Sequence, residues 1–156
     1  MQQLSLYCFI IFYSILLCNE FNYKINMFGI NMANCKVVYS DTVLNNQDAL
    51  KVQYSVKTNQ LINRIFKVNN EYTIILNRNA YNQLYYQKNT YQPHIKNTIE
   101  TEIIGDNIKY KNSNIIINPS DKNIFSILSI IQNNELSKLS EIEVIEREGK
   151  YYHFNY

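Results

Sequence analysis

The residues best suited to chemistry in this 156-residue chain are His94, His153 and Cys35, which follow an apolar N-terminus. A metal site needs several such ligands at short spacing, and a catalytic nucleophile needs a base beside it. These three residues lie in separate segments and match neither arrangement. We therefore predict no catalytic residue and no metal site. Cys35 is interpreted as a small buried apolar residue, because it shares a strand face with Ala33 and Val37.

Two carboxylates, Glu100 and Glu102, have a spacing that could serve acid–base catalysis. Residues two apart on a strand share a face, and this one also carries lysine and threonine, so solvated carboxylates are the expected interpretation. The sequence has only 3 glycines and contains no phosphate-binding loop, HExxH or GxSxG motif. We predict a protein that is not an enzyme and that has no cofactor.

The charge balance bears on the choice of partner. Lys and Arg together number 15 and Asp and Glu 13, which gives a formal net charge of only +2. Lys109 and Lys111 flank Tyr110, but strand alternation puts the tyrosine on the opposite face, which prevents base stacking and phosphate contact from one surface. We predict no nucleic-acid partner.

The N-terminus has the character of an export signal. Residues 1–18 carry no charged side chain, and the 14 residues from Leu4 to Leu17 are almost entirely apolar. As a helix they reach about 21 Å, less than the ~30 Å hydrocarbon core of a bilayer. We predict a signal peptide cleaved after Cys18, with a retained N-terminal anchor or an acylated Cys18 as alternatives. The protein is then located in the periplasm or cell envelope, and it contacts the membrane only through this segment.

Beyond residue 18 the hydrophobic pattern has a period of two, which is typical of strands with one buried face. Leu50, Val52, Tyr54 and Val56, for example, alternate with polar residues. Together with turns at Gly29, Gly105 and Glu148-Gly149, this pattern predicts an antiparallel meander. The predicted strands are 21–28, 31–44, 49–58, 71–78, 82–89, 95–104, 107–111, 113–118, 141–147 and 150–156, with one helical turn within 59–66.

One segment, about 121–132, has helical periodicity. Its apolar residues Ile124, Ile127, Leu128 and Ile131 recur at i, i+3, i+4 and i+7. Ser120 is the predicted cap, and we expect the side carrying Ile127 and Leu128 to face the sheet. The fold class is therefore mainly β (α+β), a curved antiparallel meander packed over one helix. It forms a single β-rich domain over 19–156, and whether that domain is complete is left open.

Several short motifs, in this order, resemble the domain-of-unknown-function 3108 family of exported bacterial proteins. They span about 21–152 and comprise Tyr23-Lys24-Ile25, Phe28-Gly29-Ile30-Asn31-Met32-Ala33, Lys57-Thr58-Asn59, Ile65-Phe66, Lys88, Gln92-Pro93, Ile124-Phe125-Ser126-Ile127-Leu128 and Glu146-Arg147-Glu148-Gly149-Lys150-Tyr151. The resemblance implies an exported cell-envelope protein with a mainly β domain, no established activity and no catalytic residues to transfer. Family members continue through further strands beyond the position of Tyr156, so the resemblance also implies a C-terminal truncation.

Two functions follow from this architecture. A sheet curved over a helix can leave an apolar cleft for a lipid, an acyl chain or an apolar peptide. The residues expected to line this cleft are Tyr54, Ile99, Tyr110, Phe125 and Ile131. The alternative is a structural or assembly protein. In that case the terminal strand, with Tyr152, Phe154 and Tyr156 on one face, pairs with a strand of a partner.

Overall fold

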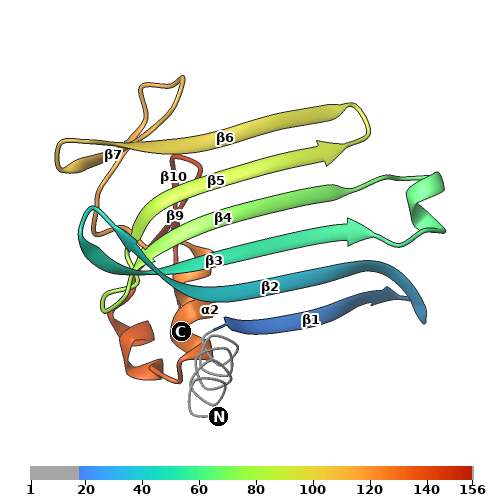
Figure 1. The fold of residues 1–156 in the computed structure, drawn as a ribbon, viewed down its shortest axis with the longest axis horizontal. Coiled ribbons are helices and arrows are strands. Elements are labelled where there is room, and N and C mark those ends of the chain that lie inside the picture. The colour runs from blue at the N-terminus through green and yellow to red at the C-terminus, as the bar shows by residue number, and fades with distance from the viewer. Residues whose placement is uncertain (1–17, 156) are drawn as a thin grey trace, which may run out of the picture.

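The structure is a computed structural model that describes residues 18–155. Eight strands form one antiparallel sheet in sequence order (Figure 1). They are β1 (Cys18–Met27), β2 (Ile30–Leu44), β3 (Gln47–Thr58), β4 (Asn69–Asn77), β5 (Gln83–Gln92), β6 (Ile95–Ile104), β7 (Asn107–Tyr110) and β8 (Ile116–Ile117). The predicted mainly β fold and meander are confirmed, as is the helical turn between β3 and β4, the 3-10 segment η1 (Ile62–Arg64).

The register between neighbouring strands explains the period-two pattern of the sequence. Apolar residues of neighbouring strands stand opposite one another, as Val52 does to Ile74 and Cys35 to Val56. Val52 and Ile74 are almost fully buried. Cys35 is a buried thiol that forms no disulfide with any residue from 18 to 155, which agrees with its apolar interpretation. Burial of this one face against later segments of the chain accounts for the strict alternation.

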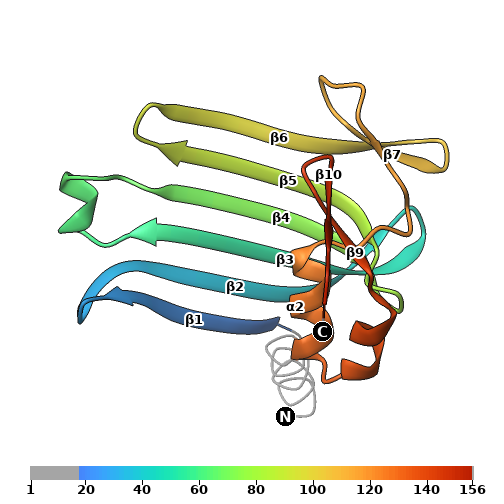
Figure 2. The same ribbon diagram turned by 180° about the vertical axis from the view of Figure 1, so that it is seen from behind.

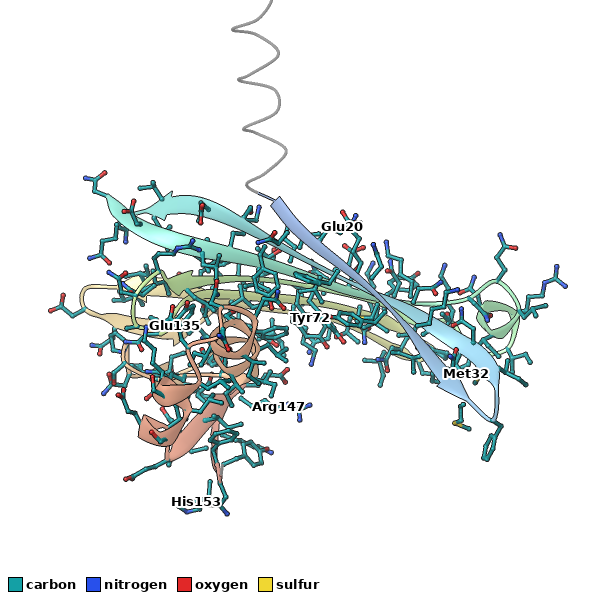
Figure 3. The ribbon with its side chains drawn as sticks, turned by 90° about the horizontal axis from the view of Figure 1, so that it is seen from below. Glu20, Met32, Tyr72, Glu135, Arg147 and His153 are labelled. Atoms are coloured by element: carbon teal, nitrogen blue, oxygen red, sulfur yellow. The ribbon has the colours of Figure 1, made fainter. Side chains whose placement is uncertain are left out.

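The segments after β8 cover one end of this face. Helix α2 (Ile124–Gln132), the 3-10 segment η2 (Leu136–Glu141) and a hairpin of β9 (Val144–Arg147) and β10 (Lys150–His153) lie there together (Figures 2 and 3). The last two strands were expected to continue the meander, and they instead form a separate two-stranded sheet. The reason is that α2 and η2 carry the chain across the face of the sheet before β9 begins.

The helix is rotated relative to the prediction. Phe125, Ile127 and Ile130 are buried, whereas Leu128 is 38% exposed and Ile131 is 50% exposed. The expectation for Ile127 is therefore confirmed, that for Leu128 holds only in part because this side chain lines a cavity, and that for Ile131 is wrong. Ser126 and Ser129 are fully buried and stand between the apolar residues of the inner face. Small side chains at these positions let the helix approach closely, and a count of apolar residues alone does not detect them.

The start of α2 also differs from the prediction. The cap is Asn123 and not Ser120. Its Oδ1 accepts hydrogen bonds from the backbone N–H groups of Phe125 (2.8 Å) and Ser126 (3.0 Å). The Ser126 hydroxyl in turn accepts from the Asn123 N–H at 3.1 Å, which completes a capping box.

Residues 1–17 of the predicted signal segment and Tyr156 of the predicted edge lie outside the described part. The final strand ends at His153 and not at residue 156. Within residues 18–155, no helix has both the length and the apolar character needed to cross a bilayer.

Candidate functional site

A cavity of about 500 Å³ lies between the sheet, the start of α2 and the β9–β10 hairpin, and we call it the hairpin cavity. It has the size of small-molecule sites in proteins. Five tyrosines contribute to its wall. The lining residues are Tyr54, Tyr72, Gln83, Tyr86, Lys88, Tyr110, Asn123, Ile124, Phe125, Leu128, Ile145, Glu146, Arg147, Glu148 and Tyr152.

One part of the wall is aromatic. Tyr54 and Tyr72 stand opposite each other on β3 and β4, with ring centroids 5.5 Å apart. Phe125 of α2 lies against both, at 5.7 Å from Tyr54 and 5.6 Å from Tyr72. These are favourable edge-to-face or tilted contacts. The cluster joins the helix to the sheet and gives the hairpin cavity a rigid apolar surface.

Another part of the wall holds a buried carboxylate, Glu146 of β9. The Tyr110 hydroxyl donates to its Oε1 at 2.8 Å, and the backbone N–H of Gly149 donates to the same atom at 2.5 Å. Burial raises the pKa of Glu146 despite these two donors. Burial and the nearby Glu146 charge also raise the pKa of Tyr110, which keeps that hydroxyl protonated as a donor.

An ion pair ties the hairpin to the sheet. Lys88 Nζ of β5 lies 2.6 Å from Oε1 of Glu148, in the turn between β9 and β10. The Tyr86 hydroxyl donates to the same oxygen at 3.3 Å. Both charged side chains are largely buried, so solvent screens this pair less than an exposed one. The turn of the hairpin is thereby fixed over β5.

One polar group at the cavity wall is left with unused donors. Gln83 is 2% exposed, and its Oε1 accepts a hydrogen bond from Nδ2 of Asn123. Asn123 is held by its role as the cap of α2, so the orientation of the Gln83 amide is set by the helix. The Nε2 of Gln83 has no hydrogen-bond partner in residues 18–155. A buried N–H without a partner costs free energy.

The structure brings together some of the residues expected to line a ligand site. Tyr54, Tyr110 and Phe125 line the hairpin cavity. Ile99 stands opposite Lys88 in the sheet and packs against the core, outside the cavity wall. Ile131 lies on the exposed side of α2 because of the helix rotation described above.

The residues expected to form a partner edge separate in the structure. Tyr152 lines the hairpin cavity, and Phe154 packs half-buried against the core. Tyr156 is outside the described residues. In the described part of the chain, β10 pairs with β9 alone, so its other edge is open.

The polar half of the site was not predicted from the sequence: Gln83, Lys88, Glu146 and Glu148. A bulge where β4 pairs with β5, between Ile75 and Leu76, turns Gln83 inward. A signal was present at Lys88, which shares a strand face with Tyr86. A lysine on an apolar face requires a carboxylate partner, and the Glu-rich C-terminal segment could have supplied one.

The two histidines lie outside the hairpin cavity. His94 and His153 are exposed, and no three His, Cys, Asp or Glu side chains from residue 18 to 155 gather closely enough to hold a metal ion. Glu100 accepts hydrogen bonds from Tyr85 (3.1 Å) and Lys111 (2.7 Å) on the outer face, as a surface carboxylate does.

Comparison with protein-family models, curated proteins and solved structures finds no match for this chain.

Proposed function

We propose that this protein is a non-enzymatic, exported cell-envelope protein that binds an amphiphilic ligand in the hairpin cavity. The observation that carries the proposal is the composition of the cavity wall. An aromatic surface of Tyr54, Tyr72 and Phe125 lies in the same cavity as the polar side chains of Gln83, Glu146 and Arg147. A mostly apolar wall with a few fixed polar groups is typical of ligand sites.

The wall also indicates the class of ligand. Apolar side chains favour a lipid tail or acyl chain, as the sequence analysis expected. The guanidinium of Arg147, which also lines the cavity, favours a head with an acceptor oxygen, such as a carboxyl or ester carbonyl. Glu146 and Glu148 already have partners and disfavour a highly charged anionic head. A fatty acid or an acyl ester therefore fits the site better than a free phosphate.

The export part of the proposal depends on the apolar segment 1–18 and on the resemblance to the domain-of-unknown-function 3108 family. No family model matches the chain, so that resemblance stays a prediction. The absence of an enzymatic role is likewise part of the proposal, supported by the scattered positions of the histidines.

Native mass spectrometry of the purified full chain tests ligand binding. We expect a bound acyl-containing molecule, or binding of added palmitic acid. Leu128 lines the cavity and is partly exposed, so Leu128→Asp should keep the fold and reduce occupancy at least about tenfold. Ile131→Asp, three residues further along the helix and outside the cavity, is the matched control and should leave occupancy unchanged. Equal occupancy in the two variants would refute the proposed site.

The second candidate function is assembly through the terminal strand, favoured by the open edge of β10. It predicts dimers or larger assemblies held by main-chain hydrogen bonds. His153 is exposed on β10, and His153→Pro removes one of its donors. Sedimentation velocity showing concentration-dependent association that this substitution abolishes would favour assembly. A monomer at all concentrations would exclude self-assembly through β10.

A further inference from the structure

The end of the sheet farthest from α2 gathers three connections. The turn between β1 and β2, the loop between β3 and β4 and the turn between β5 and β6 all lie there (Figures 1 and 2). We call these three connections, together with the ends of the strands that flank the two turns, the tip loops; they comprise residues 24–31, 59–68 and 91–96. They are tied to the sheet by backbone hydrogen bonds, including Asn59 N–H to the Met32 carbonyl (3.1 Å) and Thr58 N–H to that of Val68 (3.1 Å). Figure 3 shows Met32 at this end of the sheet, well away from the C-terminal segments that carry Glu135, Arg147 and His153.

The tip loops expose large apolar side chains. Phe28 is 92% exposed, Ile65 86% and Leu61 68%. Met27, Ile30, Phe66, Tyr91 and Ile95 are about half exposed or slightly more. An exposed apolar concentration of this kind marks an interaction site. At the opposite end of the sheet the turns themselves are polar, Asn45-Asn46 and Gly105-Asp106, and the exposed apolar residues Val43 and Ile104 stand beside them, not in them.

Phe28 is also in an unfavourable backbone conformation for its type. Its φ is +51°, followed by Gly29 at +77°. A two-residue hairpin of this form prefers Asn-Gly, because bulky residues seldom adopt positive φ. The turn between β2 and β3, at the polar end, has asparagine at both such positions, Asn45 and Asn46. Stability of the fold alone would favour asparagine at position 28. The phenyl ring therefore points to a role other than stabilising the fold.

The charged side chains of the tip loops are all positive. They are Lys24, Arg64, Lys67 and Lys96, and the three loops contain no Asp or Glu. The acidic residues closest to the loops along the chain are Glu20, Glu71 and Glu100. None of these four cations forms an ion pair with a described residue. The ammonium groups of Lys67 and Lys96 lie 5.4 Å and 5.8 Å from the centre of the Tyr91 ring.

We propose that the tip loops dock on the surface of an anionic phospholipid membrane. Phe28, Leu61 and Ile65 enter the interfacial region, while the four cations meet lipid phosphates. An apolar apex surrounded by lysine and arginine is complementary to such a surface, where each cation adds attraction and each apolar side chain leaves water. This contact is separate from the predicted N-terminal segment and uses no residue of the hairpin cavity.

A single introduced tryptophan tests the docking in the full chain, because the sequence contains none. In Phe28→Trp, addition of vesicles of phosphatidylglycerol and phosphatidylcholine should shift the emission to shorter wavelength, and brominated lipid should quench it. Ile104→Trp is the matched control. Ile104 is 50% exposed at the opposite end of the sheet and should show neither effect. The readout is local, so binding through residues 1–18 alone cannot mimic it.

Two further measurements distinguish an anionic membrane from other partners of the tip loops. Charge reversal of Arg64, Lys67 and Lys96 together should weaken the vesicle response at least about tenfold, whereas Lys150→Glu should not. Pure phosphatidylcholine vesicles should give little response. The proposal is overturned if the Phe28→Trp emission ignores anionic vesicles or responds equally to neutral ones. It is also overturned if this emission is already shifted without lipid, because a second copy or another part of the chain would then cover the tip.

Discussion

At the scale of single residues, two side chains of this molecule lie where their residue types are seldom found. Glu146 is a carboxylate in a buried position, and Phe28 is a phenyl ring in solvent. The sequence could not predict the burial of Glu146, because it depends on where the hairpin docks. The exposure of Phe28 was predictable in part, since a residue immediately before Gly29 in a tight turn projects away from the sheet.

The buried Glu146 makes stability dependent on pH. Its pKa is raised in the folded chain above the ordinary value of 4.5. As pH rises, the unfolded chain therefore releases this proton first, and folding free energy is lost between pH 4.5 and the raised pKa. Glu146→Gln keeps the acceptor for Tyr110 without the charge. Denaturant titrations should show that the variant gains stability relative to the wild type across this pH range.

The control for this measurement is Glu143→Gln, which changes an exposed carboxylate in the same segment. Its pH profile should parallel that of the wild type. A parallel profile for Glu146→Gln as well would show that Glu146 is not constrained by burial.

Replacing Phe28 by asparagine should stabilise the fold. Asparagine tolerates positive φ better than phenylalanine, and the substitution removes a fully exposed ring without loss of packing. We expect a gain of about 0.5–1 kcal/mol in the free energy of unfolding, measured in urea. A loss of stability would mean that the ring makes contacts that its exposure does not reveal.

At the scale of elements, α2 shows what periodicity can and cannot give. The period of 3.6 correctly predicted a helix ending near residue 132 and packed on the sheet. It misplaced the buried side because Ser126 and Ser129, not leucine or isoleucine, occupy the closest approach. The cap was also missed, since Asn123 is selected by its contacts with Ser126 and Gln83, which only the folded chain assembles.

Two adjacent isoleucines of α2 test its orientation. Ile130 is fully buried and Ile131 is 50% exposed. Ile130→Ala should lower the free energy of unfolding by about 2–5 kcal/mol, whereas Ile131→Ala should change it by less than about 1 kcal/mol. Chemical denaturation of both variants provides the comparison. Similar losses would mean that the helix packs with a different face.

The strands were the most predictable elements, because a sheet with one buried and one solvent-exposed face requires apolar and polar residues to alternate along each strand. The β9–β10 hairpin was predicted as two strands, but its position on the face of the meander was not. That position depends on the Lys88–Glu148 pair and on the Tyr110–Glu146 hydrogen bond, which join residues 60 and 36 positions apart. Contacts at such separations leave no local pattern in the sequence.

At the scale of the whole molecule, the sheet is covered at one end and bare at the other. The covered end holds the hairpin cavity and the bare end holds the tip loops. This polarity suits a protein that takes up an amphiphile while it contacts a lipid surface.

Export is a property of the whole chain and has its own test. Protein recovered from the cell-envelope fraction should have an intact mass that begins near Asn19, because we expect residues 1–18 to be removed. A mass that retains Met1 in the envelope fraction would support the N-terminal anchor. Recovery of the full-length chain only from the cytosol would contradict export.

The central claim is that the hairpin cavity binds an acyl chain, and photo-crosslinking tests it most directly. Palmitic acid with a diazirine in its chain would be irradiated with the full-length protein, and the labelled peptides mapped by mass spectrometry. We predict labels on peptides containing Tyr72, Leu128 and Tyr152, from three elements that meet only at the cavity, and their loss with excess unlabelled palmitic acid. Labels confined to the tip loops or the N-terminal segment, or labels that palmitic acid does not displace, would contradict the account.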